Sequence, residues 1–272
     1  MTKTVAMIAG AGLCPRIRRI IQCAWVVLLI GATQDVALAE TVKVVHPQGA
    51  AHGFVEVLAP DGKRIGVGDL LQRLHGSVVS SRLLLHFFDG SLDDETTIYS
   101  EHGVFRFISD HHIQRGPSFP KPIDETVDAE KGLVTSIDPA GKKSQVHFAM
   151  PPDVYNGMTS TLLMNEDPQA PVAKLAVVVA GEKPRLIHLS TKNAGEANFT
   201  IGGSERKATD FVVHVELGGV AGIVAPVIGK EPPDYHLLLV TGSDPAFIRE
   251  EGPLYLGGPI WRIQQISAVI AP

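Results

Sequence analysis

The residues with the clearest potential for chemistry are the run Asp110-His111-His112 and the nearby Arg115. Carboxylates and imidazoles are common metal ligands, and an imidazole titrates close to neutral pH, so it can serve as an acid or a base. A hydrolase or isomerase that uses Asp110 with His111 or His112 is therefore one candidate function. A polar spot that contacts a ligand and plain structural pairing are the other interpretations of this run.

The strand that carries this run decides which of its side chains can work together. Val104–Gln114 has the composition of a long strand, in which successive side chains point to opposite faces. We therefore expect His111 on the same face as Phe107, and His112 on the other face with Asp110. Two imidazoles on opposite faces cannot easily share one ion, so no metal site is predicted. His111 remains a candidate ligand contact.

The common catalytic signatures are missing from the sequence. It has no G-x-S-x-G nucleophile elbow, no H-E-x-x-H zinc helix and no P-loop. The acidic run Asp93-Asp94-Glu95 follows a turn signal, and we interpret it as a solvated charge run. We therefore predict no catalytic residue and no cofactor, and the sequence favours a binding protein over an enzyme.

One uncharged segment suggests what might be bound. Gly218–Gly229 reads GGVAGIVAPVIG and lies between two strand candidates, Phe211–Leu217 and Tyr235–Val240. Leaving its five large aliphatic side chains in water would forgo roughly 7–15 kcal/mol, so the core, an apolar ligand or a membrane must cover them. Three more candidate contacts lie elsewhere in the chain: Tyr155, Met158 and Trp261. The five aliphatic candidates are Val220, Ile223, Val224, Val227 and Ile228.

The first 39 residues have the pattern of an export signal. Basic residues within Arg16–Arg19 precede an apolar run, Ile20–Ala32, and Ala37-Leu38-Ala39 is a small-x-small cleavage site. The apolar run is shorter than the about 20 residues that span a bilayer comfortably. We expect cleavage before Glu40 and a periplasmic location, with an uncleaved anchor as the alternative. No integral membrane segment is expected after cleavage.

Charge and cysteine content narrow the partners. The formal net charge of the whole chain is −5, and the leader holds four basic residues and one acidic residue, so the rest is more acidic still. This balance argues against nucleic acid and against docking to anionic lipid surfaces. Both cysteines, Cys14 and Cys23, lie in the leader. The mature protein is therefore expected to have no disulfide, thiol nucleophile or thiolate metal site.

Short strand candidates separated by turn signals dominate the sequence after the leader. About ten of them, with one helix candidate at Pro151–Met164, predict a mainly β fold: a curved antiparallel sheet or half-open β-barrel. A short helix is also expected after Asp69, and one helical turn at Ala246–Glu250. The expected organisation is a signal peptide at 1–39, a poorly defined N-terminal extension at 40–76 and a single β-rich domain at 77–272.

Two long strings carry a resemblance. FRFISDHHIQRGPSFPKPID and GGVAGIVAPVIGKEPPDYHLLLV, together with the leader and the single helix, resemble a family of uncharacterised bacterial periplasmic proteins over Ser77–Ile266. Related families are similar in fold to the half-open β-barrels of periplasmic lipoprotein carriers, in which a curved sheet and a helical lid enclose an apolar cavity. This chain departs from the carriers in having one clear helix, and the resemblance supplies no catalytic residues.

These observations lead to one favoured function and two alternatives. We expect an exported, non-catalytic, monomeric protein that binds an apolar or lipid-like ligand in the cavity of a curved sheet. The first alternative is a periplasmic hydrolase or isomerase that uses Asp110, His111 or His112. The second is a cell-envelope scaffold that meets a partner through its apolar segment.

Overall fold

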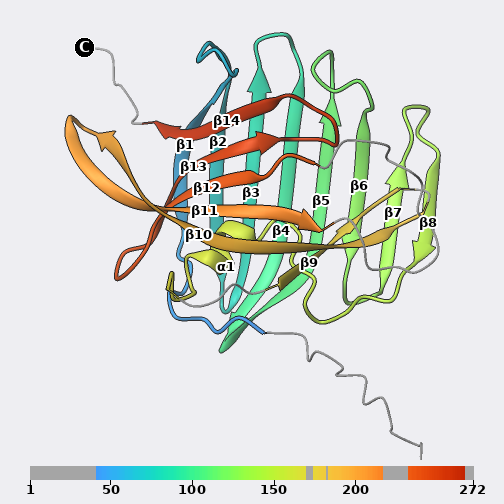
Figure 1. Cartoon of the computed structure of the whole chain (residues 1–272). Helices are drawn as coiled ribbons and strands as arrows, with labels where there is room; N and C mark the ends of the chain where they lie inside the picture. Colours follow the sequence, from blue (N-terminus) through green and yellow to red (C-terminus); the bar gives the residue numbers. More distant parts are fainter. Residues whose placement is uncertain (1–40, 170–173, 182, 217–231, 267–272) are drawn as a thin grey trace, which may run out of the picture. The chain divides into compact units, whose positions relative to one another are not determined.

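Short turns join many consecutive strands of this chain, and several of these turns contain a glycine with positive φ. The computed structural model describes residues 41–169, 174–181, 183–216 and 232–266. In these ranges fourteen strands form one open, curved antiparallel sheet, which confirms the predicted fold class (Figure 1). The strands are β1 Ala51–Leu58, β2 Arg64–His75, β3 Val78–Phe87, β4 Leu92–His102, β5 Val104–Arg115, β6 Ile123–Asp128, β7 Leu133–Ile137, β8 Lys143–His147, β9 Lys174–Val179, β10 Arg185–Ile201, β11 Ser204–Glu216, β12 Tyr235–Val240, β13 Ala246–Pro253 and β14 Ile260–Ile266.

The strand order shows how the sheet bends back on itself. It runs from β8 through β1 and then from β14 to β9, so the first and last strands pair at its middle. Strands β10 to β14 cross in front of the strands that precede them in the chain (Figure 1). We call β1–β8 the first wall and β9–β14 the second wall. The two walls face each other across an interior in which apolar side chains from both are buried.

Most of the segment expected to be an N-terminal extension, 40–76, belongs to this sheet, because it contains β1 and β2. β1 pairs with both β2 and β14, so it occupies the middle of the sheet, and the boundary expected after residue 76 does not hold. The short helix expected after Asp69 is part of β2, which pairs with β3 along its length. The helical turn expected at Ala246–Glu250 is likewise part of β13, between β12 and β14.

The predicted helix Pro151–Met164 is much shorter in the structure. α1 spans Thr159–Leu163 only. Gly157 has a φ of +64°, outside the right-handed helical region, so the helix cannot extend back through it. Before Gly157 the chain is extended, and Val154 forms a parallel bridge with Ala176 of β9.

This extended segment also covers the free edge of β9. The Tyr155 amide donates to the Ala176 carbonyl at 2.8 Å, and the Ala176 amide donates to the Asp153 carbonyl at 3.1 Å. The Asn156 side chain then both donates to and accepts from the backbone of Val178, each at 2.8 Å. An exposed strand edge invites pairing with another chain, and here the protein's own segment satisfies it.

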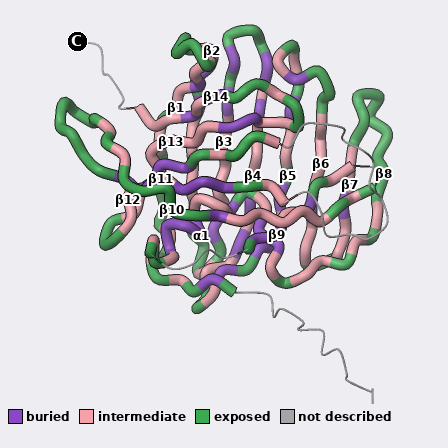
Figure 2. Tube along the Cα trace, viewed as in Figure 1, coloured by how far each residue is buried: buried purple, intermediate pink, exposed green. Residues whose placement is uncertain are grey.

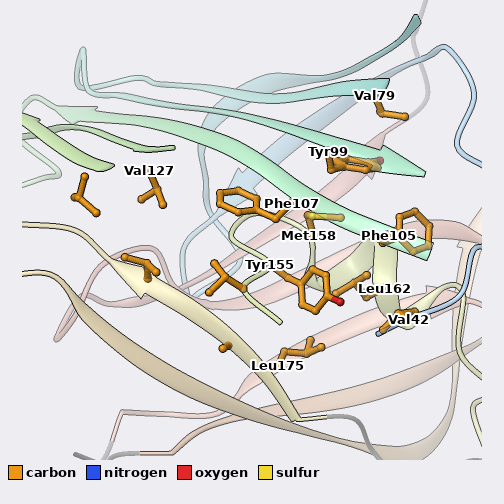
Figure 3. Close-up of a cluster of buried hydrophobic side chains, with 14 residues drawn as sticks. Val42, Val79, Tyr99, Phe105, Phe107, Val127, Tyr155, Met158, Leu162 and Leu175 are labelled. Atoms are coloured by element: carbon orange, nitrogen blue, oxygen red, sulfur yellow. The ribbon is translucent and has the colours of Figure 1, made fainter. Parts of the chain in front are cut away.

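α1 lies between the walls and packs against both. Met158 and Leu162 join Tyr99, Phe105 and other side chains of the first wall in one buried cluster that also includes residues of β9 (Figure 3). Leu163 and Met164, on the opposite side of the helix, join a second cluster. Its other members are Phe211, Val213, Leu237 and Leu239 of β11 and β12. The helix therefore fills one part of the space between the walls.

A third cluster joins the walls where β1 meets β14. Val55 and Val57 pack there with a group of aromatic rings whose centroids are 5.1–6.3 Å apart. Its rings are Phe87, Phe119, Tyr255 and Trp261. Burial is greatest in these facing regions, whereas β8 at the sheet edge is largely exposed (Figure 2).

The turn at Gly157 supplies a first test of this arrangement. A Cβ at Gly157 would overlap the hydroxyl of Thr97 on β4, and the positive φ adds strain of about 1–2 kcal/mol. We expect Gly157→Ala to lower the free energy of unfolding more than Gly141→Ala. Gly141 has a similar φ of +81° but open space around it. Urea denaturation of both variants is the measurement, and equal losses would contradict close packing of Gly157 on β4.

Candidate functional site

A bulge in β5 sets the chemistry of the interior. Tyr99 of β4 pairs with Phe107, but its neighbour Ile98 pairs with Ser109, so Ile108 has no partner on β4. An extra residue in one strand shifts the alternation of its side chains. Phe107 is therefore buried before the bulge, and Asp110 is buried after it, at 8% and 5% exposure.

The bulge corrects the predicted faces of the histidines. His111 does not share the face of Phe107: its imidazole is 47% exposed on the outer surface, 2.9 Å from the Asp124 carboxylate. His112 shares a face with Asp110, as expected, but this face points inward, whereas Arg106 is exposed. Strict alternation of side chains along the whole strand predicts the wrong face for His111, because the sequence pattern does not reveal the extra residue.

The inward side chains of β4 and β5 form a polar ladder. The register places Asp93 opposite Gln114, Glu95 opposite His112 and Thr97 opposite Asp110. Gln114 Nε2 donates to Asp93 Oδ2 at 2.9 Å, and Thr97 Oγ1 donates to Asp110 Oδ1 at 2.9 Å. His112 Nε2 lies 2.8 Å from Asp93 Oδ1. These bonds form two groups on the first wall, one that joins Gln114, Asp93 and His112 and one that joins Thr97 and Asp110, with Glu95 between them in the register.

The acidic run of β4 is thus not a solvated charge run. Asp93 is 5% exposed and Glu95 lines the interior cavity, so that interpretation is wrong for both. Only Asp94 points outward, where its two carboxylate oxygens each accept a hydrogen bond of 2.7 Å from Arg82. Adjacent residues of a strand must diverge in this way.

The second wall adds another acid and two connections. Glu250 of β13 stands between Leu237 and Ile263 in the register, and all three line the same cavity. Gln114 Nε2 also donates to the Leu254 carbonyl at 2.9 Å, which links β5 to the segment after β13. The Tyr235 hydroxyl donates to the Pro253 carbonyl at 3.0 Å and fixes the same segment.

A cavity of about 870 Å³ lies between the walls. Its apolar lining comes from both walls and from the end of α1. A smaller polar pocket of about 180 Å³ shares Glu95, His112 and Glu250 with it and adds Asp93. The basic side chains that line the large cavity are His112 and the exposed Lys121 and Arg185. Representative apolar lining residues are Leu83, Val127, Met164, Leu189, Leu237 and Phe247.

Burial among like charges raises the pKa values of the interior carboxyls. Burial, and then the charge of Glu95, raises the pKa of Asp110 to about 8. Burial, and then the charges of Glu95 and Asp93, raises the pKa of Glu250 to about 7. The pKa of Glu95 is raised by burial and by Asp93, and that of Glu125 on β6 by burial. These carboxyls therefore hold protons at a pH where exposed acids are ionised.

His112 responds in the opposite sense to the same surroundings. Burial lowers its pKa, but the hydrogen bond with Asp93 and the charges of Glu95, Asp93 and Asp110 outweigh burial and raise the pKa to about 9. The imidazole is therefore cationic at neutral pH. It is also the basic group within the polar ladder, where it is flanked in the register by Glu95 on β4 and Glu125 on β6.

The structure separates the predicted ligand contacts. Tyr155 and Met158 are fully buried in the cluster around α1, and Trp261 is in the aromatic cluster. None of these three, nor His111, is among the residues that line the cavity. The remaining predicted contacts lie outside the described residues. They are Val220, Ile223, Val224, Val227 and Ile228.

The sequence prediction missed Glu95, Gln114 and Glu250 as residues of the interior. The signal for β4 was present in the alternation of Asp93, Glu95 and Thr97 towards the buried Tyr99. Within the part of the chain that the structure describes, no three His, Cys, Asp or Glu side chains are placed to hold a metal ion together. No helix of the described ranges is both long and apolar enough to cross a membrane.

The raised pKa values predict how stability depends on pH. The ordinary pKa of Asp is 3.8, so between about pH 4 and 8 folded Asp110 holds a proton that the unfolded chain releases. His112 acts in the same sense between its ordinary 6.5 and about 9. We therefore expect the free energy of unfolding to fall as the pH rises from about 6 to about 9.

Asp110→Asn should make this decline shallower, because the amide keeps an acceptor for Thr97 and cannot ionise. Asp124→Asn on the outer surface is the matched control and should leave the slope close to that of the parent. Urea denaturation across this pH range measures both variants. An unchanged slope in Asp110→Asn would show that Asp110 does not titrate as a buried acid.

No protein-family model matches the chain, and no curated protein matches it. Among solved structures, the chain is similar to the beta-barrel-like protein of domain of unknown function DUF1849 from Brucella abortus. The two are 9% identical, with a TM-score of 0.46 over 84% of this chain and 100% of the other.

Proposed function

We propose that this protein binds an apolar or lipid-like ligand between the two walls of its curved sheet and does not transform it. The observation that carries the proposal is the cavity of about 870 Å³, lined by aliphatic and aromatic side chains from both walls. Binding sites for small molecules have volumes of about 300–1,000 Å³, mostly apolar linings and a few polar groups that fix orientation. The volume of the cavity lies in this range, and its lining combines apolar side chains with charged groups that include Glu95, Asp110, Glu125 and Glu250.

Packing on either side of the cavity keeps it formed. α1 contacts both walls through its two buried faces, and the aromatic cluster joins them near β1 and β14. Gln114 adds a hydrogen bond across the gap to Leu254. A ligand that enters a preformed site does not have to offset the cost of ordering it.

A second candidate function is favoured by one observation. Asp110 and His112, which the sequence singled out as possible catalytic groups, both line the cavity. A raised carboxyl pKa beside an imidazole is typical of acid–base sites. The two functions differ in the fate of the ligand: a hydrolase or isomerase alters it, so mass spectrometry of the small molecule before and after incubation separates them.

Export is part of the proposal and rests on the composition of residues 1–39. Expressed with its own leader in a Gram-negative bacterium, the protein should be recovered from the periplasm with Glu40 as its first residue, because Ala37-Leu38-Ala39 fits a cleavage site. N-terminal sequencing measures this. Recovery of the intact chain with the membranes would instead favour an uncleaved anchor.

A substitution that fills the cavity tests binding directly. Val177 of β9 lines the cavity, so Val177→Trp should reduce the affinity for the apolar fluorophore phenylnaphthylamine at least about fivefold, by occupying its space. Val67→Trp is the matched control, because Val67 is 37% exposed and is not among the lining residues. Equal binding by both variants, or no binding by the parent, would contradict the proposed site.

A further inference from the structure

The polar pocket beside the large cavity contains more acid than base. Asp93, Glu95 and Glu250 contribute three carboxyl groups to this pocket of about 180 Å³, and His112 contributes one imidazole. That imidazole already has a partner, since it lies 2.8 Å from Asp93. The pocket therefore has acid groups that the side chains around it leave uncompensated.

Glu95 and Glu250 are the two acids without a partner. Both are half-buried and line the cavity and the pocket, and neither makes a hydrogen bond or an ion pair with any residue in the described part of the chain. Partial burial removes some of the water that would otherwise hydrogen-bond to these carboxyl groups, and no protein group replaces it in the described ranges. An arrangement of this kind on two facing walls points to a group that arrives from outside.

The acids next to Glu95 and Glu250 in the sequence are paired with arginines. Asp94, next to Glu95, is paired with Arg82, and Glu251, next to Glu250, accepts a hydrogen bond of 2.9 Å from Arg262. Each arginine is partly exposed, and none of the four residues lines the cavity. The two inward acids thus differ from their outward neighbours, because neither hydrogen-bonds a basic side chain in the described ranges, although the charge of His112 lowers the pKa of Glu95.

We propose that the bound ligand carries a cationic head group, such as a primary amine, which occupies the polar pocket between Glu95 and Glu250 while its apolar part fills the larger cavity. This inference rests on the proposed function and specifies the chemistry of the ligand. An ammonium group supplies hydrogen-bond donors and positive charge, and charge-assisted hydrogen bonds in an enclosed site are among the stronger polar contacts. The cavity beyond the pocket offers the apolar surface for the chain of an amphiphile.

Three amphiphiles with the same chain length test the head group. Dodecylamine, dodecanol and dodecanoate should each displace phenylnaphthylamine from the parent protein, with dodecylamine bound about tenfold or more tightly than dodecanol. If none of them binds, the proposed function fails and this inference fails with it. If all three bind alike, the apolar site stands and the cationic head group is wrong. Tightest binding of dodecanoate would also overturn it and would point to Lys121 and Arg185 instead.

Paired variants locate the head group. Glu95→Gln/Glu250→Gln keeps the side-chain shape and removes the inward charges, so the preference for the amine should fall to about twofold or less while dodecanol binding is retained. Asp94→Asn/Glu251→Gln removes the same charge from the adjacent outward positions and should keep the preference. A preference that survives in the inward variant would overturn the assignment. If that double variant does not fold, Glu95→Gln and Glu250→Gln are measured separately, each with a partial loss expected.

The dependence of binding on pH gives an independent signature. Binding of a cation favours ionised carboxylates, so dodecylamine affinity should rise between about pH 6 and pH 8, with protons released. The pKa values of about 7 for Glu250 and about 8 for Asp110 lie in this window. Calorimetry in two buffers of different ionisation enthalpy measures the protons, and proton uptake would overturn the proposal. The charged and titratable groups that face the site are Asp93, Glu95, Asp110, His112, Glu125, Tyr235 and Glu250, with Lys121 and Arg185 in the cavity lining.

Discussion

The one extra residue in β5 is the constraint on which the interior depends. Ile108 has no partner on β4, and the strand therefore presents Phe107 to the interior on one side of the bulge and Asp110 on the other. The apolar part packs with α1 and β9, which gives that region a dense core. The polar part meets Asp93 and Glu95 of β4 instead, so the same pair of strands makes a packed apolar region and a polar one.

The polar region lowers the stability of the folded protein. Enclosed carboxyls with raised pKa values favour protonation, and each ionisation at higher pH opposes folding. The three apolar clusters must offset this cost, and they lie on either side of the cavity rather than within it. Polar groups that lower the stability of the fold in this way are typical of functional sites, because apolar side chains at the same positions would pack more favourably.

Much of the fold was readable from the sequence, because turns and β-prone runs are local features. β12 has the bounds that the sequence predicted, Tyr235–Val240, and β5 differs from its prediction by one residue at its end. The helix was overestimated because Val154, Met158 and Leu162 recur near a helical period. All three side chains are buried, but Val154 belongs to the extended segment against β9. The spacing of these apolar residues therefore indicated burial and did not indicate a helix.

The site was less predictable, because it depends on pairings far apart in sequence. Nothing in the local sequence pattern marks the bulge at Ile108. Without the bulge, His111 rather than His112 would lie on the same face of β5 as the buried phenylalanines. Likewise Glu250 meets the acids of β4 only because the second wall folds over the first. Long-range register, not residue type, decides which side chains share the interior.

Two pairs of adjacent acids lie on strands of this sheet, and the alternation of side chains acts on both pairs in the same way. In Asp94-Glu95 and Glu250-Glu251 the two side chains must point to opposite faces, so an outward partner for one acid leaves the other inside. Arg82 and Arg262 satisfy the outward members at the surface, where solvent lowers the cost of charge. The inward members, Glu95 and Glu250, arrive from opposite walls at one pocket. Two strands from opposite walls that each direct to this pocket an acid with no hydrogen-bonding partner in the described ranges argue for a shared occupant more strongly than either acid would alone.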